Sequence, residues 1–226
     1  MDKKTYYELL ESKLPTYKEF RRIPVQDNGE SLVPIGGEFD GKIDILEDYK
    51  KYTGNQIFVR SNVLKMLIQA QKALKDINQD YNLEILCGYR HPEIQEKTHN
   101  DIKQFLIDRE PQLKGDDLTE AAHRFSAAPD VAGHPTGGAV DVRIIGSDGA
   151  PIDMGPAFVP DKDVHVFSPF VERVEWNNRQ LLRNCMVKVG FAPFDGEWWH
   201  FSYGDREWAN YYGKAEAIYQ QIRFQL

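Results

Sequence analysis

Two short glycine-bounded segments constrain this chain more than anything else in it. The first, GHPTGGAVDV, carries His134 and Asp141. The second, GEWWHF, carries Glu197 and His200. Two histidines and a carboxylate are a usual ligand set for a catalytic zinc ion, which keeps its fourth position for water. A second carboxylate beside that water can act as a general base. We therefore expect a fold in which the two segments meet.

The first segment has a turn followed by a predicted strand. The glycines at 137–138 allow the chain to turn sharply, so His134 can face back toward a carboxylate on the strand. Residues 139–145, AVDVRII, alternate and are rich in β-branched side chains, which predicts a strand. On this strand Asp141 shares a face with Ala139, whose small side chain leaves space beside a metal.

The second segment cannot be a straight strand if both of its polar residues face one site. Glu197 and His200 are three residues apart, which places them on opposite faces of a strand unless the chain bends, bulges or ends there. A simpler interpretation is a hairpin at Asp195–Gly196 with an exposed acid, while Trp198 and Trp199 pack in the core. Each residue alone is a weak indication of a ligand, but the two segments together favour a metal site.

The remaining pattern favours an α+β protein of one domain, with a small, mainly antiparallel sheet, flanking helices and long loops. Apolar spacing predicts helices at 62–79, 92–108 and 171–189, a helix within 5–22 and a helical tail at 205–222. Apolar runs predict strands at 83–89 and 139–145, and two short strands within 191–203. Loops are expected at 23–60, at 109–133 around a short helix at 118–126, and at 150–170. We expect residues 1–60 to be an extension that wraps a catalytic core at 61–226.

Charge and hydropathy exclude several classes of protein. The formal net charge is -7 without a basic run, which argues against a nucleic-acid partner. No apolar stretch approaches the ~20 residues that span a bilayer. No apolar run follows the basic residues near the N-terminus, so a cytoplasmic location is expected. Cys87 and Cys185 each lie in an apolar run, which predicts two buried free thiols.

At this point the two segments resemble a known family. The first matches the motif HxxGxAxD at 134–141, and the second matches ExWH at 197–200. Together they resemble the zinc D,D-peptidases, which include VanX-type D-alanyl-D-alanine dipeptidases and VanY-type D,D-carboxypeptidases. The triplet GYR at 88–90, the pair MG at 154–155 and the double tryptophan resemble the dipeptidase branch. The matching residues span roughly 88–201.

The resemblance implies a role for each of these side chains. One zinc ion per chain is expected, with His134, Asp141 and His200 as its ligands. Glu197 is expected to be the general base, and Arg90 is expected to stabilise the transition state. The position of Arg90 directly after a buried strand favours a site role over a surface ion pair. Of the other histidines, His91 is expected near the site, and the rest are assigned to surface or loop structure: His99, His123 and His165.

Two positions depart from the family pattern. The family usually has Ser two residues before the first ligand, where this chain has Ala132. The dipeptidase branch usually has Asp in its MGxxFD loop, where it can hold the free ammonium of the substrate, and this chain has Val159 there. The candidate replacements for that acid are Asp153, Asp161 and Asp163. Both departures concern substrate recognition rather than the metal.

The sequence thus predicts a zinc-dependent dipeptidase that hydrolyses D-alanyl-D-alanine or a related D,D-dipeptide. Its expected partner is this small substrate, with no nucleic acid and no membrane. One alternative is a D,D-carboxypeptidase or endopeptidase on peptidoglycan stem peptides, which needs an open cleft and export. The other is a non-catalytic zinc-containing binding module. Glu197 argues against the module, because a structural zinc usually closes its fourth position and has no use for a base.

Overall fold

The computed structural model describes residues 1–159 and 162–226 of the chain. Its helices are α1 (Lys3–Glu11), α2 (Tyr17–Arg22), η1 (Glu47–Tyr49), α3 (Lys50–Thr53), α4 (Ser61–Ile77), α5 (Pro92–Arg109), α6 (Gly115–His123), η2 (His134–Thr136), η3 (Lys162–Val164), α7 (Arg173–Lys188) and α8 (Arg206–Tyr211). Its strands are β1 (Leu32–Pro34), β2 (Lys42–Ile43), β3 (Phe58–Arg60), β4 (Asn82–Cys87), β5 (Ala139–Ile145), β6 (Ala192–Pro193) and β7 (His200–Ser202).

A five-stranded sheet in the order β2-β4-β5-β7-β6 forms the centre of the molecule. Only the β2–β4 pair of this sheet is parallel, and its other pairs are antiparallel. Strands β1 and β3 form a separate antiparallel pair. The observed fold therefore confirms the predicted α+β class with a small, mainly antiparallel sheet.

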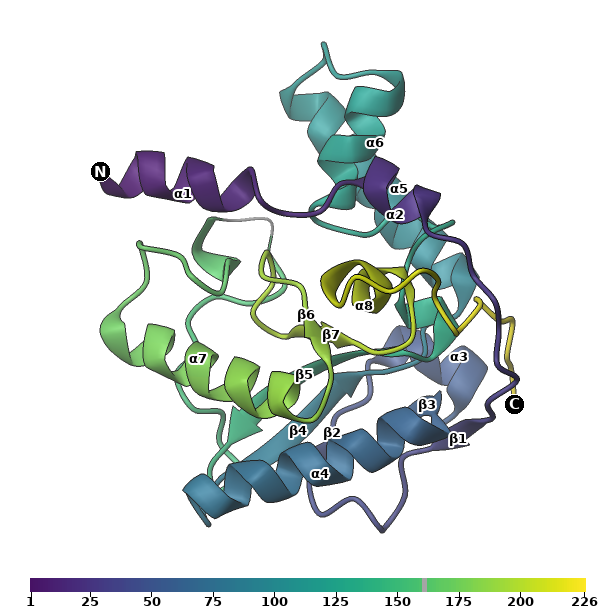
Figure 1. Cartoon of the computed structure of the whole chain (residues 1–226), viewed down its shortest axis with the longest axis vertical. Coiled ribbons are helices and arrows are strands. Elements are labelled where there is room, and N and C mark those ends of the chain that lie inside the picture. Colours follow the sequence, from purple (N-terminus) through teal and green to yellow (C-terminus); the bar gives the residue numbers. More distant parts are fainter. Residues whose placement is uncertain (160–161) are drawn as a thin grey trace.

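Helices α4 and α7 lie side by side and cover one face of this sheet (Figure 1). Alternation along β5 explains the arrangement, because Val140, Val142 and Ile144 are fully buried and belong to the same apolar core as Leu67 and Leu182 of the two helices. The other face of β5 carries the polar side chains. One face of the sheet therefore packs on the apolar core, and the opposite face is available for a site.

Most predicted elements have the predicted extent. The long helices α4, α5 and α7 and the strands β4 and β5 differ from the expected ranges by a few residues at most. The expected helix within 5–22 is two helices, because Pro15 separates α1 from α2. The prediction of a helical tail at 205–222 is wrong after Tyr211, where Gly213 takes a positive φ of 60° and the chain continues without helix.

Residues 1–60 reach several parts of the molecule. Strand β2 adds to the edge of the central sheet and β1 pairs with β3. Further toward the N-terminus, the backbone N–H groups of Tyr17 and Lys18 donate to the Glu120 carboxylate of α6. The boundary between extension and core at residue 60 stays a prediction. No helix among the described residues has the length and apolar character to cross a membrane.

Candidate active site

The site begins as a row of residues across three neighbouring strands. Asp141 in β5 is paired in register with Cys87 of β4 on one side and with His200 of β7 on the other. A register shift between Ile85 and Cys87 makes Cys87 the partner of Asp141. A bulge of this kind re-aims a side chain at a strand end. The row therefore places Asp141 at the centre of the site, between a thiol and an imidazole.

His134 reaches the row from the turn that precedes β5. The turn is tight: Gly137 takes a positive φ of 74°, and at Gly133 the carboxylate of Asp205 leaves no room for a β-carbon. The Nδ1 of His134 lies 2.8 Å from the Gly88 carbonyl oxygen, so Nδ1 carries the hydrogen and donates it. Nε2 is then the ring nitrogen that faces Asp141 and is placed to bind a metal.

Two distances between the predicted ligand atoms are close to those of a tetrahedral zinc site. Tetrahedral zinc with bonds of about 2.0–2.2 Å holds its ligand atoms roughly 3.3 Å apart. The Oδ1 of Asp141 lies 3.3 Å from Nε2 of His134 and 3.1 Å from Nδ1 of His200. The two imidazole rings meet edge to face at 4.9 Å. The structure thus places both predicted histidine ligands against the Asp141 carboxylate.

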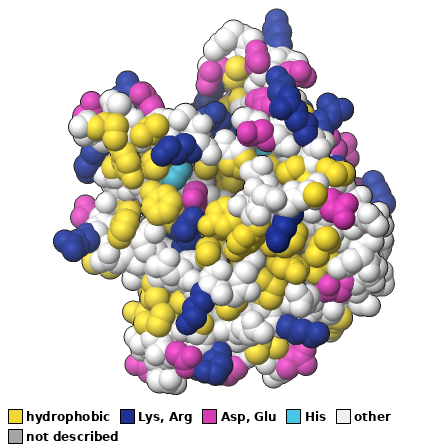
Figure 2. All heavy atoms as spheres, in the orientation of Figure 1, with side chains coloured by type: hydrophobic (Ala, Val, Ile, Leu, Met, Phe, Trp, Pro, Cys, Tyr) yellow, Lys and Arg dark blue, Asp and Glu magenta, His cyan; other side chains and the backbone are white. Residues whose placement is uncertain are grey.

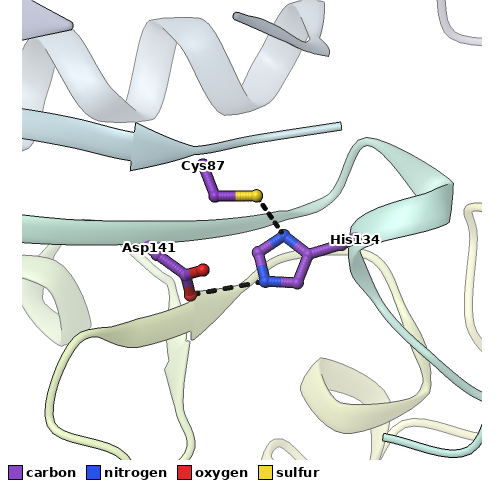
Figure 3. Close-up of side chains that lie close together, drawn as sticks. All are labelled: Cys87, His134 and Asp141. Carbon is purple, nitrogen blue, oxygen red and sulfur yellow. Dashed lines mark hydrogen bonds and ion pairs between the residues drawn. The ribbon is translucent and has the colours of Figure 1, made fainter. Parts of the chain in front are cut away.

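Metal-binding side chains also lie close together in a second group, which consists of Cys87, His134 and Asp141. Figure 3 shows that Cys87 and Asp141 approach opposite nitrogens of the His134 ring. The sulfur lies 3.5 Å from Nδ1, whereas Asp141 faces Nε2. One ion cannot bind both ring nitrogens of the same histidine. The sulfur therefore lies on the Nδ1 side of His134, away from the nitrogen that faces Asp141.

The charges of the site stabilise one another. Burial raises the pKa of Asp141, but the facing imidazoles of His134 and His200 lower it well below its usual range. Burial lowers the pKa of His134, but the negative charges of Cys87 and Asp141 outweigh this effect and raise it to about 10. The site is thus an anionic centre that holds positive charge, as a divalent cation supplies.

Arg90 lies beside the same carboxylate. One of its terminal nitrogens, Nη2, is 3.6 Å from Oδ2 of Asp141, and Nη1 donates to Oε1 of Gln95 at 3.0 Å. Its Nε–H is buried without a hydrogen-bond partner among the described residues. The backbone N–H of Arg90 donates to the carbonyl of His134, which ties the end of β4 to the first histidine. The guanidinium is therefore held at the site with donor capacity left over.

Glu197 lies in the turn between β6 and β7. Its N–H donates to the Phe194 carbonyl, and its own carbonyl accepts from the N–H of His200. This double turn supplies the bend that the three-residue spacing requires. Burial raises the pKa of Glu197 to about 7, because the low-dielectric surroundings disfavour the charged form. A carboxylate with a pKa near neutrality is suited to take and return a proton.

Glu207 of α8 stands behind the second histidine. Its Oε2 is 3.6 Å from Nε2 of His200, the ring nitrogen that points away from Asp141. Its other oxygen is sealed from solvent and has no hydrogen-bond partner within 1–159 and 162–226, and burial raises the pKa of the carboxyl well above its usual value. Carboxylates in this position orient ligand histidines and fix their tautomer. Sequence reasoning missed Glu207, because α8 is short and carries no motif.

The site opens into a pocket of about 490 Å³. Val159 and Ala132, the two departures from the family pattern, both line it. Asp153 does not line it: this residue is exposed, and its carboxylate accepts a hydrogen bond from the N–H of Gly155. Asp161 lies outside the described residues. Asp163 is not among the lining residues either.

The assignment to surface or loop structure is wrong for His99 and His123, which lie in α5 and α6, whereas His165 lies in an irregular segment as expected. His99, His123 and His165 are all buried, and His123 lines the pocket. Each of these rings contacts the backbone; for example, the Nδ1 of His123 accepts a hydrogen bond from the N–H of Ala128. His91 lies next to Arg90 in sequence but stacks on Tyr52 at 3.9 Å and does not line the pocket.

Comparison with known proteins decides the family. The family model described as D-ala-D-ala dipeptidase, Peptidase_M15, matches residues 43–218. The chain belongs to this family. It is therefore a zinc-dependent metallopeptidase, as the resemblance of the two motifs implied. A D-alanyl-D-alanine dipeptidase of Synechocystis sp. is 28% identical over 92% of this chain and 95% of its own length. One of Enterococcus faecium is 27% identical over 71% of this chain and 80% of its own length.

Solved structures of related peptidases are more distant. The LD-carboxypeptidase LdcB has a TM-score of 0.47 and 19% identity, with 84% of this chain and 82% of that chain covered. The vancomycin-resistance D,D-dipeptidase VanXYg, in complex with a D-Ala-D-Ala phosphinate analog, has a TM-score of 0.42 and 18% identity, with 88% and 70% covered. The family model begins after residue 42, so the whole N-terminal segment through α2 and β1 lies outside it.

Proposed function

We propose that this peptidase hydrolyses D-alanyl-D-alanine or a closely related D,D-dipeptide unit, with His134, Asp141 and His200 as zinc ligands. The observation that carries the proposal is the spacing of about 3 Å from Asp141 to each imidazole, with Glu197 in the adjoining turn. The curated relatives at 27–28% identity support the same substrate class. A cytoplasmic location and a role in peptidoglycan metabolism belong to this proposal.

The residues of the chain divide the reaction between them. Zinc bound at this centre polarises the scissile carbonyl and acidifies the attacking water. Glu197 accepts one proton from the water as its oxygen attacks the carbonyl carbon, and returns a proton to the nitrogen of the leaving amino acid. Arg90 donates hydrogen bonds to the oxyanion that develops on the carbonyl oxygen. Hydrolysis thus converts the peptide bond into a carboxyl group and an amine, and Glu197 is again ready to accept a proton.

Release of D-alanine from D-Ala-D-Ala by the zinc-loaded protein tests this proposal. We expect turnover that requires zinc, with L-Ala-L-Ala cleaved at least about a hundredfold more slowly, because the site must discriminate by the placement of fixed groups. Equal cleavage of the two stereoisomers would make the protein a general dipeptidase. Release from neither, at full zinc content, would refute the proposed activity.

A further inference from the structure

We propose that the far side of the pocket, built partly by the N-terminal segment, is a subsite for an uncharged apolar group on the amino-terminal side of the D,D-dipeptide unit. This inference rests on the proposed function and names the substrate class more closely. The group is either a large apolar side chain on the first residue or an acyl extension on its nitrogen.

The first argument is size. A dialanine molecule occupies roughly the volume of six waters, or about 180 Å³ at ~30 Å³ per water. The pocket offers about 490 Å³, within the range of roughly 300–1,000 Å³ that accommodates ligands of drug size. D-Ala-D-Ala alone therefore leaves more than half of the pocket unfilled, and unfilled apolar space contributes nothing to binding.

The second argument is the chemistry of the walls. Besides the residues of the metal centre, the pocket is lined by apolar side chains from four separate parts of the chain: Leu14, Phe20, Ile102, Ala127, Val131 and Phe194. The side chains of Thr98, His123, Arg124 and Ser126 add polar groups to the same lining. Phe20 and Val131 pack together in a small apolar cluster of their own. Figure 2 shows hydrophobic side chains grouped on this face beneath the projecting α5–α6 pair and beside the N-terminal helix. These apolar walls favour an apolar group, because removing apolar surface from water stabilises the complex.

The third argument concerns the charge of the substrate. A free dipeptide carries an ammonium group that must be paired when it is buried. Four carboxylates among the described residues line the pocket: Glu11, Asp141, Glu197 and Glu207. Asp141 and Glu197 serve the metal centre, and Glu11 is paired with Arg124 at 3.5 Å. Glu207 faces His200, and its unpartnered oxygen is sealed from the pocket. No described carboxylate is thus left over for an ammonium.

The N-terminal segment is fixed over this part of the pocket from both sides. On one side Glu11 pairs with Arg124 at the end of α6, and Tyr7 packs edge to face on Phe170 at 5.8 Å on the other. In between, Leu14 lies so close to Gly196 that a β-carbon there would come within 3.0 Å of its Cδ1. The N-terminal segment is therefore an integral part of the pocket wall, although it precedes the residues that the family model matches.

Binding to the zinc-loaded Glu197→Ala protein tests the subsite without turnover. The ligands are D-Ala-D-Ala, N-hexanoyl-D-Ala-D-Ala and D-Phe-D-Ala, and the readout is the dissociation constant by calorimetry. We expect at least one extended ligand to bind about tenfold or more tightly than D-Ala-D-Ala. Preference for the hexanoyl ligand identifies an acyl extension, and preference for D-Phe-D-Ala identifies a side chain. Weaker or equal binding of both would overturn the inference.

A filling substitution locates the effect. In Glu197→Ala, adding Ala127→Leu at the half-buried wall should remove most of the advantage of the extended ligand and leave D-Ala-D-Ala unaffected. Ala121→Leu, a half-buried alanine of α6 outside the pocket lining, is the matched control. Equal losses in the two variants would overturn the inference. Hydrolysis of D-Ala-D-Ala by the unaltered protein tests the proposed function separately. A negative binding result would refute the subsite alone, and an absence of hydrolysis would refute the proposed function alone.

Discussion

The metal centre and the outer wall of the pocket are built in different ways. The centre takes Asp141 and His200 from paired strands, and the register of the sheet fixes their separation. The outer wall, which we define as residues 7–20, 123–132, 158–159 and 164, comes from helices, helix ends and irregular segments. One residue of this wall, Phe158, has a positive φ of 56°. Strand pairing therefore determines where the chemistry occurs, and the less regular wall determines which substrate reaches it.

The largest expected effect follows from breaking the centre at its middle. Asp141 faces His134, His200 and Arg90, so Asp141→Ala removes the carboxylate that these three side chains share. We expect the loss of bound zinc and a fall in turnover of about a thousandfold or more. Metal analysis and D-alanine release measure these effects. Asp148→Ala, in an exposed turn, should change neither, and retention of zinc by Asp141→Ala would contradict the ligand assignment.

A smaller effect is expected in the outer wall, on stability and its dependence on pH. Burial, together with the nearby His99, lowers the pKa of His123 from 6.5 to about 4. Between these values the unfolded chain takes up the proton and the folded chain does not, so stability falls as the pH decreases from 6.5 to 4. The loss is of the order of 3 kcal/mol. Urea unfolding at pH 7.5 and pH 5 should show about 2 kcal/mol of this loss, because pH 5 lies about 1.5 units below 6.5. His123→Gln should weaken the dependence, and an unchanged slope would contradict this cause.

Removing the carboxyl group of Glu207 behind His200 is expected to lower zinc affinity less than removing a predicted ligand. Glu207→Gln keeps the shape of the side chain but replaces the carboxyl group near Nε2 of His200 with an amide. We expect zinc affinity to fall by about 10–100-fold, as for other groups that orient metal ligands. Competition with a chelator measures the affinity. Glu216→Gln, at an exposed position, is the control, and equal affinities in the two variants would show that Glu207 does not orient His200.

A charge placed in the outer wall should change specificity without affecting the centre. Val159 lines the pocket and has 46% of its surface exposed, so Val159→Asp adds a carboxylate that can pair with a substrate ammonium. We expect the ratio of kcat/KM for D-Ala-D-Ala over N-acetyl-D-Ala-D-Ala to rise about tenfold. Val174→Asp, exposed on α7 and outside the lining, should leave the ratio unchanged. A ratio that falls in Val159→Asp would place the amine elsewhere.

The smallest expected effect concerns the sulfur behind His134. Because Cys87 approaches Nδ1 rather than the nitrogen that faces Asp141, Co²⁺-substituted protein should show no thiolate charge-transfer absorption. Cys87→Ser should retain metal affinity within about tenfold. Its control is Cys185→Ser, at the other buried thiol. A thiolate band that disappears in Cys87→Ser would make the sulfur a ligand and displace His200 from the set.

The difference between the two regions also explains what the sequence could predict. The strand β5, the turn at Gly137 and the bend at Glu197 follow from local patterns, so the grouping of His134, Asp141 and His200 could be expected from their spacing. Residues that reach the site through tertiary packing carry no local signal. Glu207 sits on a short helix and Cys87 is turned inward by a bulge, and neither position has a motif. The burial of three histidines was missed for the same reason.

The measurement that tests the central claim most directly is zinc content together with D-alanine release for Glu197→Ala. The account predicts one zinc ion per chain in this variant, as in the unaltered protein, and a loss of turnover of about a thousandfold, because a general base contributes roughly 10²–10⁴-fold. Turnover of D-Ala-D-Ala at the unaltered rate, with zinc bound, would contradict it, since the turn between β6 and β7 would then hold no catalytic base.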